Sequence, residues 1–197
     1  MIAYLPVAGR VAKPWKNGGG STADIVVEPA GAGLNDFEWR ISVATITGNG
    51  PFSEFKGVDR SLSLLSDAPL RLLVDEVCFP LDRQHPTLRF SGEARVRAEV
   101  QAGPHNGQAA GPHTVLNVMS RRDCFSHLLS QHAFTAQREI ELDAAINILF
   151  VQSGECQVPD AGLLLQTHDA LLVKEEKTIR LHAGAAVSLI AVAIRPA

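Results

Sequence analysis

The chain has 197 residues, of which 46% are hydrophobic, enough for one large or two small domains with a real core. A net charge of -3 and a pI near 6.1 argue against nucleic-acid binding, which usually needs a basic face or tail. The three cysteines form no CxxC pair, a usage typical of reduced thiols in a cytoplasm. Residues 1–7 lack a basic start, and the longest uncharged stretch, 183–194, is too short to span a bilayer. We therefore expect a cytoplasmic protein without a membrane segment.

The first segment of interest in chain order is 14–20, which contains Trp15, Lys16 and Asn17 followed by three glycines. Consecutive glycines free the backbone to turn sharply or to approach a ligand. About twenty residues on, segment 37–42 adds the second tryptophan, Trp39, with Arg40 and Ser42. Aromatic rings with a few placed polar groups are typical of a small-molecule pocket. A glycine loop followed by an ordinary strand with an exposed arginine is equally compatible with these two segments.

Short apolar runs with period-two alternation dominate the chain, for example at 37–43, 96–100, 146–150 and 185–191. Gly, Pro, Asn and Asp separate these runs at close intervals, a pattern typical of a sandwich or barrel of short strands. Helical patterns are scarce, and a short helix or turn is expected only near 11–17 and 126–132.

The second half of the chain begins after a Gly- and Pro-rich segment, 103–112, which predicts a surface loop. The strand after this loop still belongs to the first half, and a second β-rich unit follows residue 122. Its pattern of strand, Gly turn, strand, Asp turn and strand is typical of the double-stranded β-helix of cupins. We therefore predict an all-β bicupin, with two RmlC-like jelly-roll barrels packed together, formed by residues 1–122 and 123–197.

Catalytic and metal motifs are weak in this sequence. No two of the seven histidines form an HxH pair, so we predict no metal site and no cofactor. There is no GxSxG elbow, and Gly18 to Ser21 lacks the spacing of a phosphate-binding loop. The arginines Arg40, Arg60 and Arg121, if they gather at one barrel mouth, would bind an anionic small molecule, because guanidinium holds carboxylate through a planar fork. The alternative is that arginines pair with nearby acids: Arg60 with Asp59, Arg122 with Asp123, Arg40 with Glu38.

Several motifs occur in order: 14–20 with Thr22, 39–42, 50–53, 57–60, 90–93 and 117–122. In these motifs the chain resembles the HutD/Ves family of bacterial bicupin-like proteins. The resemblance implies a metal-free double cupin with a role tied to histidine utilisation. Family members are thought to bind a small pathway intermediate and to moderate the pathway rather than to catalyse a known step.

The resemblance also implies a set of ligand-binding candidates in the first barrel. The candidates are Trp15, Lys16, Asn17, Trp39, Arg40, Ser42, Asp59, Arg60, Asn117, Met119 and Arg121. In one respect the chain departs from the family pattern, since Val115 stands where an acid usually lies two positions before the asparagine.

Two functions follow as hypotheses. The first is a non-catalytic, metal-free protein that binds a small anionic metabolite, a carboxylate of the formylglutamate or urocanate class, between Trp15 or Trp39 and Arg40. The second is a metal-independent isomerase or hydrolase acting on a histidine-degradation intermediate, with Lys16, Glu38 or a histidine as acid–base group. The sequence contains no persuasive acid–base pair, which favours binding. It leaves the oligomeric state open between a monomer and a homodimer.

Overall fold

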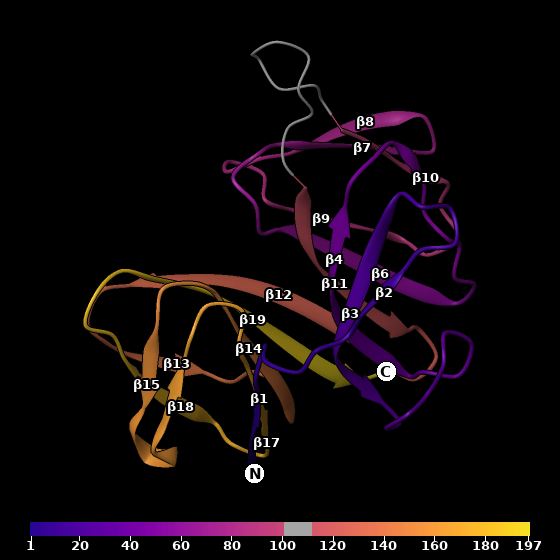
Figure 1. The fold of residues 1–197 in the computed structure, drawn as a ribbon. Helices are drawn as coiled ribbons and strands as arrows, with labels where there is room; N and C mark the ends of the chain where they lie inside the picture. The colour runs from indigo at the N-terminus through magenta and orange to yellow at the C-terminus, as the bar shows by residue number, and fades with distance from the viewer. Residues whose placement is uncertain (101–111) are drawn as a thin grey trace. The chain divides into compact units, whose positions relative to one another are not determined.

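The computed structural model describes residues 1–100 and 112–197, and strands dominate them (Figure 1). Within these residues the helical element is one 3-10 turn, η1 (Pro159–Ala161), so the all-β prediction is confirmed. The helix or turn expected at 126–132 is wrong, because these residues lie in strand β12 (Phe125–Phe134). The loop predicted at 103–112 falls almost wholly outside the described residues. No helix of the described part has the length and apolar character needed to cross a membrane.

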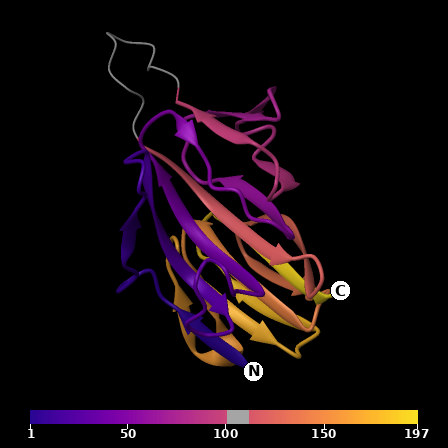
Figure 2. The same ribbon diagram turned by 90° about the vertical axis from the view of Figure 1, so that its right-hand side faces the viewer.

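The chain forms two compact units, Val11–Cys124 and a second unit made of Met1–Arg10 with Phe125–Ala197. The first ten residues, which we assigned to the N-terminal barrel, therefore belong to the other unit. The reason is that β1 (Ile2–Leu5) pairs antiparallel with β17 (Ala170–Lys174) (Figures 1 and 2). The Asp169 carboxylate secures this segment by accepting hydrogen bonds from the Tyr4 hydroxyl and the Val7 amide, at 2.8 and 2.7 Å.

The unit Val11–Cys124 is built from two sheets. Its six-stranded sheet runs in the order β2 (Ala12–Pro14), β3 (Gly20–Glu28), β4 (Trp39–Ile46), β11 (His113–Arg121), β6 (Val58–Leu64) and β9 (Thr87–Ser91). Its four-stranded sheet runs in the order β5 (Gly50–Pro51), β10 (Val96–Glu99), β7 (Leu70–Val74) and β8 (Val77–Leu81). Alternation explains the core: Val96 and Ala98 are buried while Arg97 is exposed, and both sheets contribute apolar side chains to one cluster.

The other unit is also built from two sheets. The five-stranded sheet runs in the order β1, β17, β14 (Ile146–Ser153), β19 (Val187–Pro196) and β12. The four-stranded sheet runs in the order β13 (Gln137–Glu141), β18 (Thr178–His182), β15 (Cys156–Val158) and β16 (Leu163–Leu165). Its core contains apolar side chains such as Leu149, Leu171, Leu181 and Leu189, which are fully buried.

An ionic network on the unit Val11–Cys124 ties β6 and β9 to the end of β11. The Arg122 guanidinium lies 2.7 Å from both the Asp59 and Glu93 carboxylates, and Arg89 reaches Asp59 at 2.9 Å. The expected pairs of Arg122 with Asp123 and of Arg60 with Asp59 are therefore wrong. A hydrogen bond from Arg122, followed by those from the Ser91 hydroxyl and the Gly57 amide, lowers the pKa of Glu93 well below its usual value of 4.5.

We expect Glu93→Gln to reduce stability in a pH-dependent way. Because the folded pKa of Glu93 lies below its unfolded value, its contribution is present above about pH 4.5 and is lost as pH falls through the folded pKa. Urea unfolding of parent and variant should therefore show the largest difference near neutral pH and convergence in acid. Glu54→Gln, at an exposed glutamate outside the network, is the matched control. A difference that does not change with pH would contradict this account.

Candidate functional site

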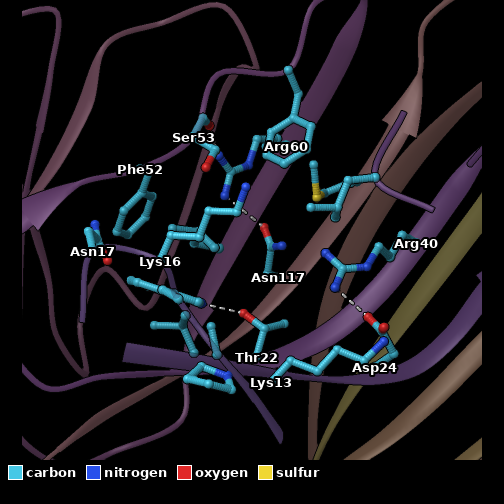
Figure 3. A pocket seen from close by; sticks show the side chains of 18 of the residues that line it. Lys13, Lys16, Asn17, Thr22, Asp24, Arg40, Phe52, Ser53, Arg60 and Asn117 are labelled. Atoms are coloured by element: carbon cyan, nitrogen blue, oxygen red, sulfur yellow. Dashed lines mark hydrogen bonds and ion pairs between the residues drawn. The ribbon is translucent and has the colours of Figure 1, made fainter. Parts of the chain in front are cut away.

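The unit Val11–Cys124 contains a cavity of about 600 Å³, within the range of small-molecule sites. Its wall is formed by β2, β3, β4, β6 and β11, together with the segments 32–34 and 51–55 (Figure 3). Of the predicted ligand-binding residues, the structure brings seven to this wall: Trp15, Lys16, Asn17, Arg40, Arg60, Asn117 and Met119.

Strand register explains why these residues meet. Met119 on β11 lies directly opposite Arg40 on β4 and Arg60 on β6, so the three form one row across the sheet. In the next row Asn117 lies opposite Ser42 and Leu62. Since side chains two residues apart share a face of a strand, both rows point into the same space.

Arg60 is the most unusual residue of the cavity. Its side chain is only 6% exposed, and its guanidinium lies 5.2–5.6 Å from the ring centres of Phe52, Phe55 and Phe90. It donates hydrogen bonds to the Ser53 carbonyl at 3.2 Å and to Asn117 Oδ1 at 3.4 Å, while its buried Nε has no partner.

No carboxylate of the described residues forms an ion pair with Arg60. Burial, followed by repulsion from Arg40, lowers the pKa of Arg60 to about 10. A guanidinium held in an apolar site without a counter-ion is costly, because desolvation of a charge is offset only by a partner. The described protein does not supply that partner, and a bound anion would.

Arg40, unlike Arg60, has an acidic partner. Its side chain is 12% exposed, and its Nη2 lies 2.5 Å from Oδ1 of Asp24 on β3. The expected pair of Arg40 with Glu38 is therefore wrong, because the carboxylate beside Arg40 belongs to Asp24. The acid that pairs with Arg40 comes from the neighbouring strand.

The segment 15–20 forms one wall as a tight turn. The Trp15 amide donates to the Gly20 carbonyl at 2.9 Å, and the Gly18 amide donates to the Trp15 carbonyl at 3.1 Å. The Trp15 indole donates to Thr22 Oγ1 at 2.7 Å and packs edge-on against Phe52. Asn17 is exposed, and its side-chain amide also stabilises the turn. Its Nδ2 donates a hydrogen bond to the Pro51 carbonyl, and its Oδ1 accepts one from the Gly19 amide.

Lys16 is the free cation of this turn. It is exposed and forms no ion pair with any residue of 1–100 or 112–197. In Figure 3 its side chain extends toward Arg60 and Asn117. With Lys13, Arg40 and Arg60 it makes four cationic groups on the described wall, against a single carboxylate from Asp24.

The other four predicted residues do not line the cavity. Trp39 is fully buried on the opposite face of β4 from Arg40. Ser42 is also fully buried, and Nδ2 of Asn117 donates to its hydroxyl at 3.5 Å. Asp59 belongs to the Arg122 network.

Arg121 lies at the end of β11, where its guanidinium is used for the backbone. It donates to the Phe37 carbonyl at 2.8 Å and to the Asn35 carbonyl, and it lies over the Phe37 ring. Arg121 thus anchors the segment that precedes β4 and is not available to a ligand in the cavity.

Sequence reasoning missed several wall residues, most importantly Asp24, Phe52, Phe55 and Lys13. A signal existed for Asp24, which alternates with Thr22 on an amphipathic strand. Phe52 lies in the motif 50–53, although no pattern identified its side chain as part of a cavity wall, and no signal existed for Phe55. Both come from the irregular segment 52–57 between β5 and β6. Val115, where the family pattern usually has an acid, is fully buried and lines the cavity as an apolar residue.

The donor set of the cavity suits an anion and does not suit a metal cation. Metal ions in proteins of this kind are bound by histidine and carboxylate groups. Among the residues that the structure describes, no three His, Cys, Asp or Glu side chains lie together. The cavity's one described carboxylate, Asp24, already faces Arg40.

Comparison with known proteins gives the family. Protein Ves of Citrobacter koseri is 31% identical over 182 residues, covering 91% of this chain and 87% of that protein. An uncharacterised 21.2 kDa protein in the hutC 3′ region of Pseudomonas putida is 40% identical over 94 residues, 46% of this chain and 47% of that protein.

Solved structures agree with this result. HutD from Pseudomonas fluorescens SBW25, solved in a formate condition, superposes with a TM-score of 0.78 and 28% identity over 99% of this chain and 100% of that one. A cupin 2 conserved barrel domain protein from Leptotrichia buccalis gives a TM-score of 0.58 at 6% identity, over 93% of this chain and 91% of that one. This second likeness concerns the fold alone and confirms the predicted cupin-like barrels. The sequence model of the HutD family matches residues 8–191, and the chain therefore belongs to the HutD family.

Proposed function

We propose that the barrel of residues 11–124 binds a small carboxylate metabolite of the formylglutamate or urocanate class, and thereby moderates histidine utilisation without catalysis. Family membership and the Pseudomonas putida relative from the hutC region link the chain to histidine utilisation. The observation that carries the proposal is Arg60: a buried guanidinium that faces a 600 Å³ cavity without an acidic partner among the described residues.

The rest of the wall supports the same ligand chemistry. Guanidinium binds carboxylate through two parallel hydrogen bonds, and Lys16 adds a mobile second charge. Trp15 and Phe52 offer apolar contact to the body of a small molecule. The sequence motifs predict that the carboxylate binds at Arg40. We instead propose Arg60 as the main anchor, because Arg40 already has a counter-ion.

Titration of the protein with formylglutamate, urocanate and glutamate tests this proposal. We expect calorimetry to give a Kd at or below roughly 1 mM for at least one of them, equivalent to about -4 kcal/mol. Trp15 lines the cavity and Trp39 does not, so Trp15→Phe should abolish the change in tryptophan fluorescence while calorimetric binding persists. Absence of binding at millimolar concentration would reject the proposal. Chromatography of the same mixtures detects turnover and so tests the alternative of a metal-independent isomerase or hydrolase.

A further inference from the structure

Asp24 lines the cavity from β3, next to an irregularity of that strand. Asp24 lies opposite Ser42, but the register then shifts, so that Val26 lies opposite Ile41 and Val27 opposite Arg40. The extra residue, Ile25, is a β-bulge, a feature that re-aims side chains beside functional sites. Because Asp24 lies opposite Ser42, it is a diagonal neighbour of Arg40 on the cavity face of the sheet, within reach of a long side chain.

The contact between Asp24 and Arg40 neutralises charge but leaves hydrogen-bond donors free. Oδ1 of Asp24 is buried 2.5 Å from Arg40 Nη2, and no well-aligned hydrogen bond reaches it from the described residues. Arg40 makes no hydrogen bond to another described side chain or carbonyl. A guanidinium has five N–H donors, so Arg40 keeps several that can point at a ligand. In Figure 3 Arg40 and Asp24 lie together on one side of the cavity, apart from Arg60.

The cavity therefore has two unlike ends. Arg40 and Arg60 flank Met119 in one row, so their Cα atoms are roughly 10 Å apart, two interstrand spacings. Long side chains that extend inward bring both guanidinium groups within reach of one small molecule. At the Arg60 end the guanidinium lacks an acid, while at the Arg40 end the positive charge is already compensated.

We propose that Asp24 sets the charge selectivity of the site: by neutralising Arg40, it reserves that end for an uncharged hydrogen-bond acceptor, such as an amide carbonyl, while the carboxylate binds at Arg60. This inference rests on the proposed function and adds the ligand's second polar group to it. A second carboxylate at the Arg40 end would lie beside Asp24, and like charges at close range repel.

Two probes of matched shape test this inference. Glutarate carries a carboxylate at each end of a five-carbon chain, and glutaramate replaces one carboxylate by an uncharged amide. We compare the parent protein with Asp24→Asn, which keeps the shape of the side chain but removes its charge. Asp67→Asn is the matched control, because Asp67 pairs with Arg83 at 2.9 Å on the exposed surface. Calorimetry gives the Kd of each probe, and thermal unfolding verifies that each variant is folded.

In the parent we expect glutaramate to bind more tightly than glutarate. In Asp24→Asn the affinity for glutarate should rise at least about tenfold more than the affinity for glutaramate. The reason is that the second carboxylate of glutarate gains a charge-assisted hydrogen bond with Arg40, and one such bond accounts for a change of that size. Asp67→Asn should leave the ratio of the two Kd values unchanged.

Three outcomes would overturn the inference. Unchanged Kd values for both probes in Asp24→Asn overturn it and leave the proposed function intact. An equal gain for both probes shows that the shared carboxylate binds at Arg40, which also overturns it. Absence of binding of both probes to both proteins also overturns the inference, while the titrations with formylglutamate, urocanate and glutamate decide the proposed function separately.

Discussion

Arg60→Met is expected to weaken carboxylate binding by about a hundredfold, because truncating one partner of a buried charge pair costs about 2–5 kcal/mol. The same substitution should not destabilise the protein. Replacing a buried charge that lacks a counter-ion by an apolar residue of similar volume is often neutral or stabilising. Methionine also packs well against aromatic rings, and three of them surround Arg60.

Calorimetry of ligand binding and thermal unfolding of the same samples check both halves of this prediction. Arg60→Lys should recover little affinity, because an ammonium group lacks the planar fork of guanidinium. Arg83→Met is the matched control: Arg83 is exposed, pairs with Asp67 and lies outside the cavity. If Arg60→Met binds as tightly as the parent, the buried arginine serves the fold and not a ligand.

Gly20→Ala should have the largest effect on stability among the substitutions considered. A Cβ at Gly20 would lie under 3.0 Å from the Thr45 carbonyl oxygen and 3.1 Å from the Trp15 ring. Because the first of these contacts is with backbone, the neighbour cannot turn aside, and we expect a loss of about 2–3 kcal/mol in the free energy of unfolding. Displacement of Trp15 should also weaken binding at the cavity.

Gly48→Ala is the matched control for this prediction. A Cβ at Gly48 meets no heavy atom within 4 Å, so this variant should unfold at nearly the same urea concentration as the parent. Chemical denaturation followed by tryptophan fluorescence provides the comparison. Equal midpoints for Gly20→Ala and Gly48→Ala would show that the turn relaxes without cost, which would contradict the rigid wall described here.

The alternation of apolar and polar residues along the chain was sufficient to predict the strands and part of the candidate site. Alternation placed Arg40, Ser42 and Ala44 on one face of β4, and Asn117 with Met119 on one face of β11, and the sheet register aligns these faces. The same alternation placed Arg121 beside them. Arg121 lies at the end of its strand, where carbonyl groups of the preceding segment accept its hydrogen bonds.

What the sequence could not show is pairing across strands. Each arginine was matched with the nearest acid along the chain, yet Asp59 pairs with Arg89 and Arg122, and Asp24 pairs with Arg40. The second of these pairs depends on which residues of β3 and β4 lie opposite each other, and hydrophobic alternation along either strand does not contain that register. The absence of an acid beside Arg60 is likewise a property of the folded sheet.

Strand β1 is synthesised long before β17, the strand with which it pairs. Residues 2–5 pair with residues 170–173, so at roughly 5–20 residues per second, synthesis separates the two by roughly 8–35 seconds. In the last part of that interval, after residue 121 has been made, the unit 11–124 has all its described strands, whereas the second unit still lacks β17, the strand beside β1 in its sheet. A fusion partner that immobilises the first ten residues would therefore hinder the unit completed last on the ribosome, not the barrel that follows those residues in sequence.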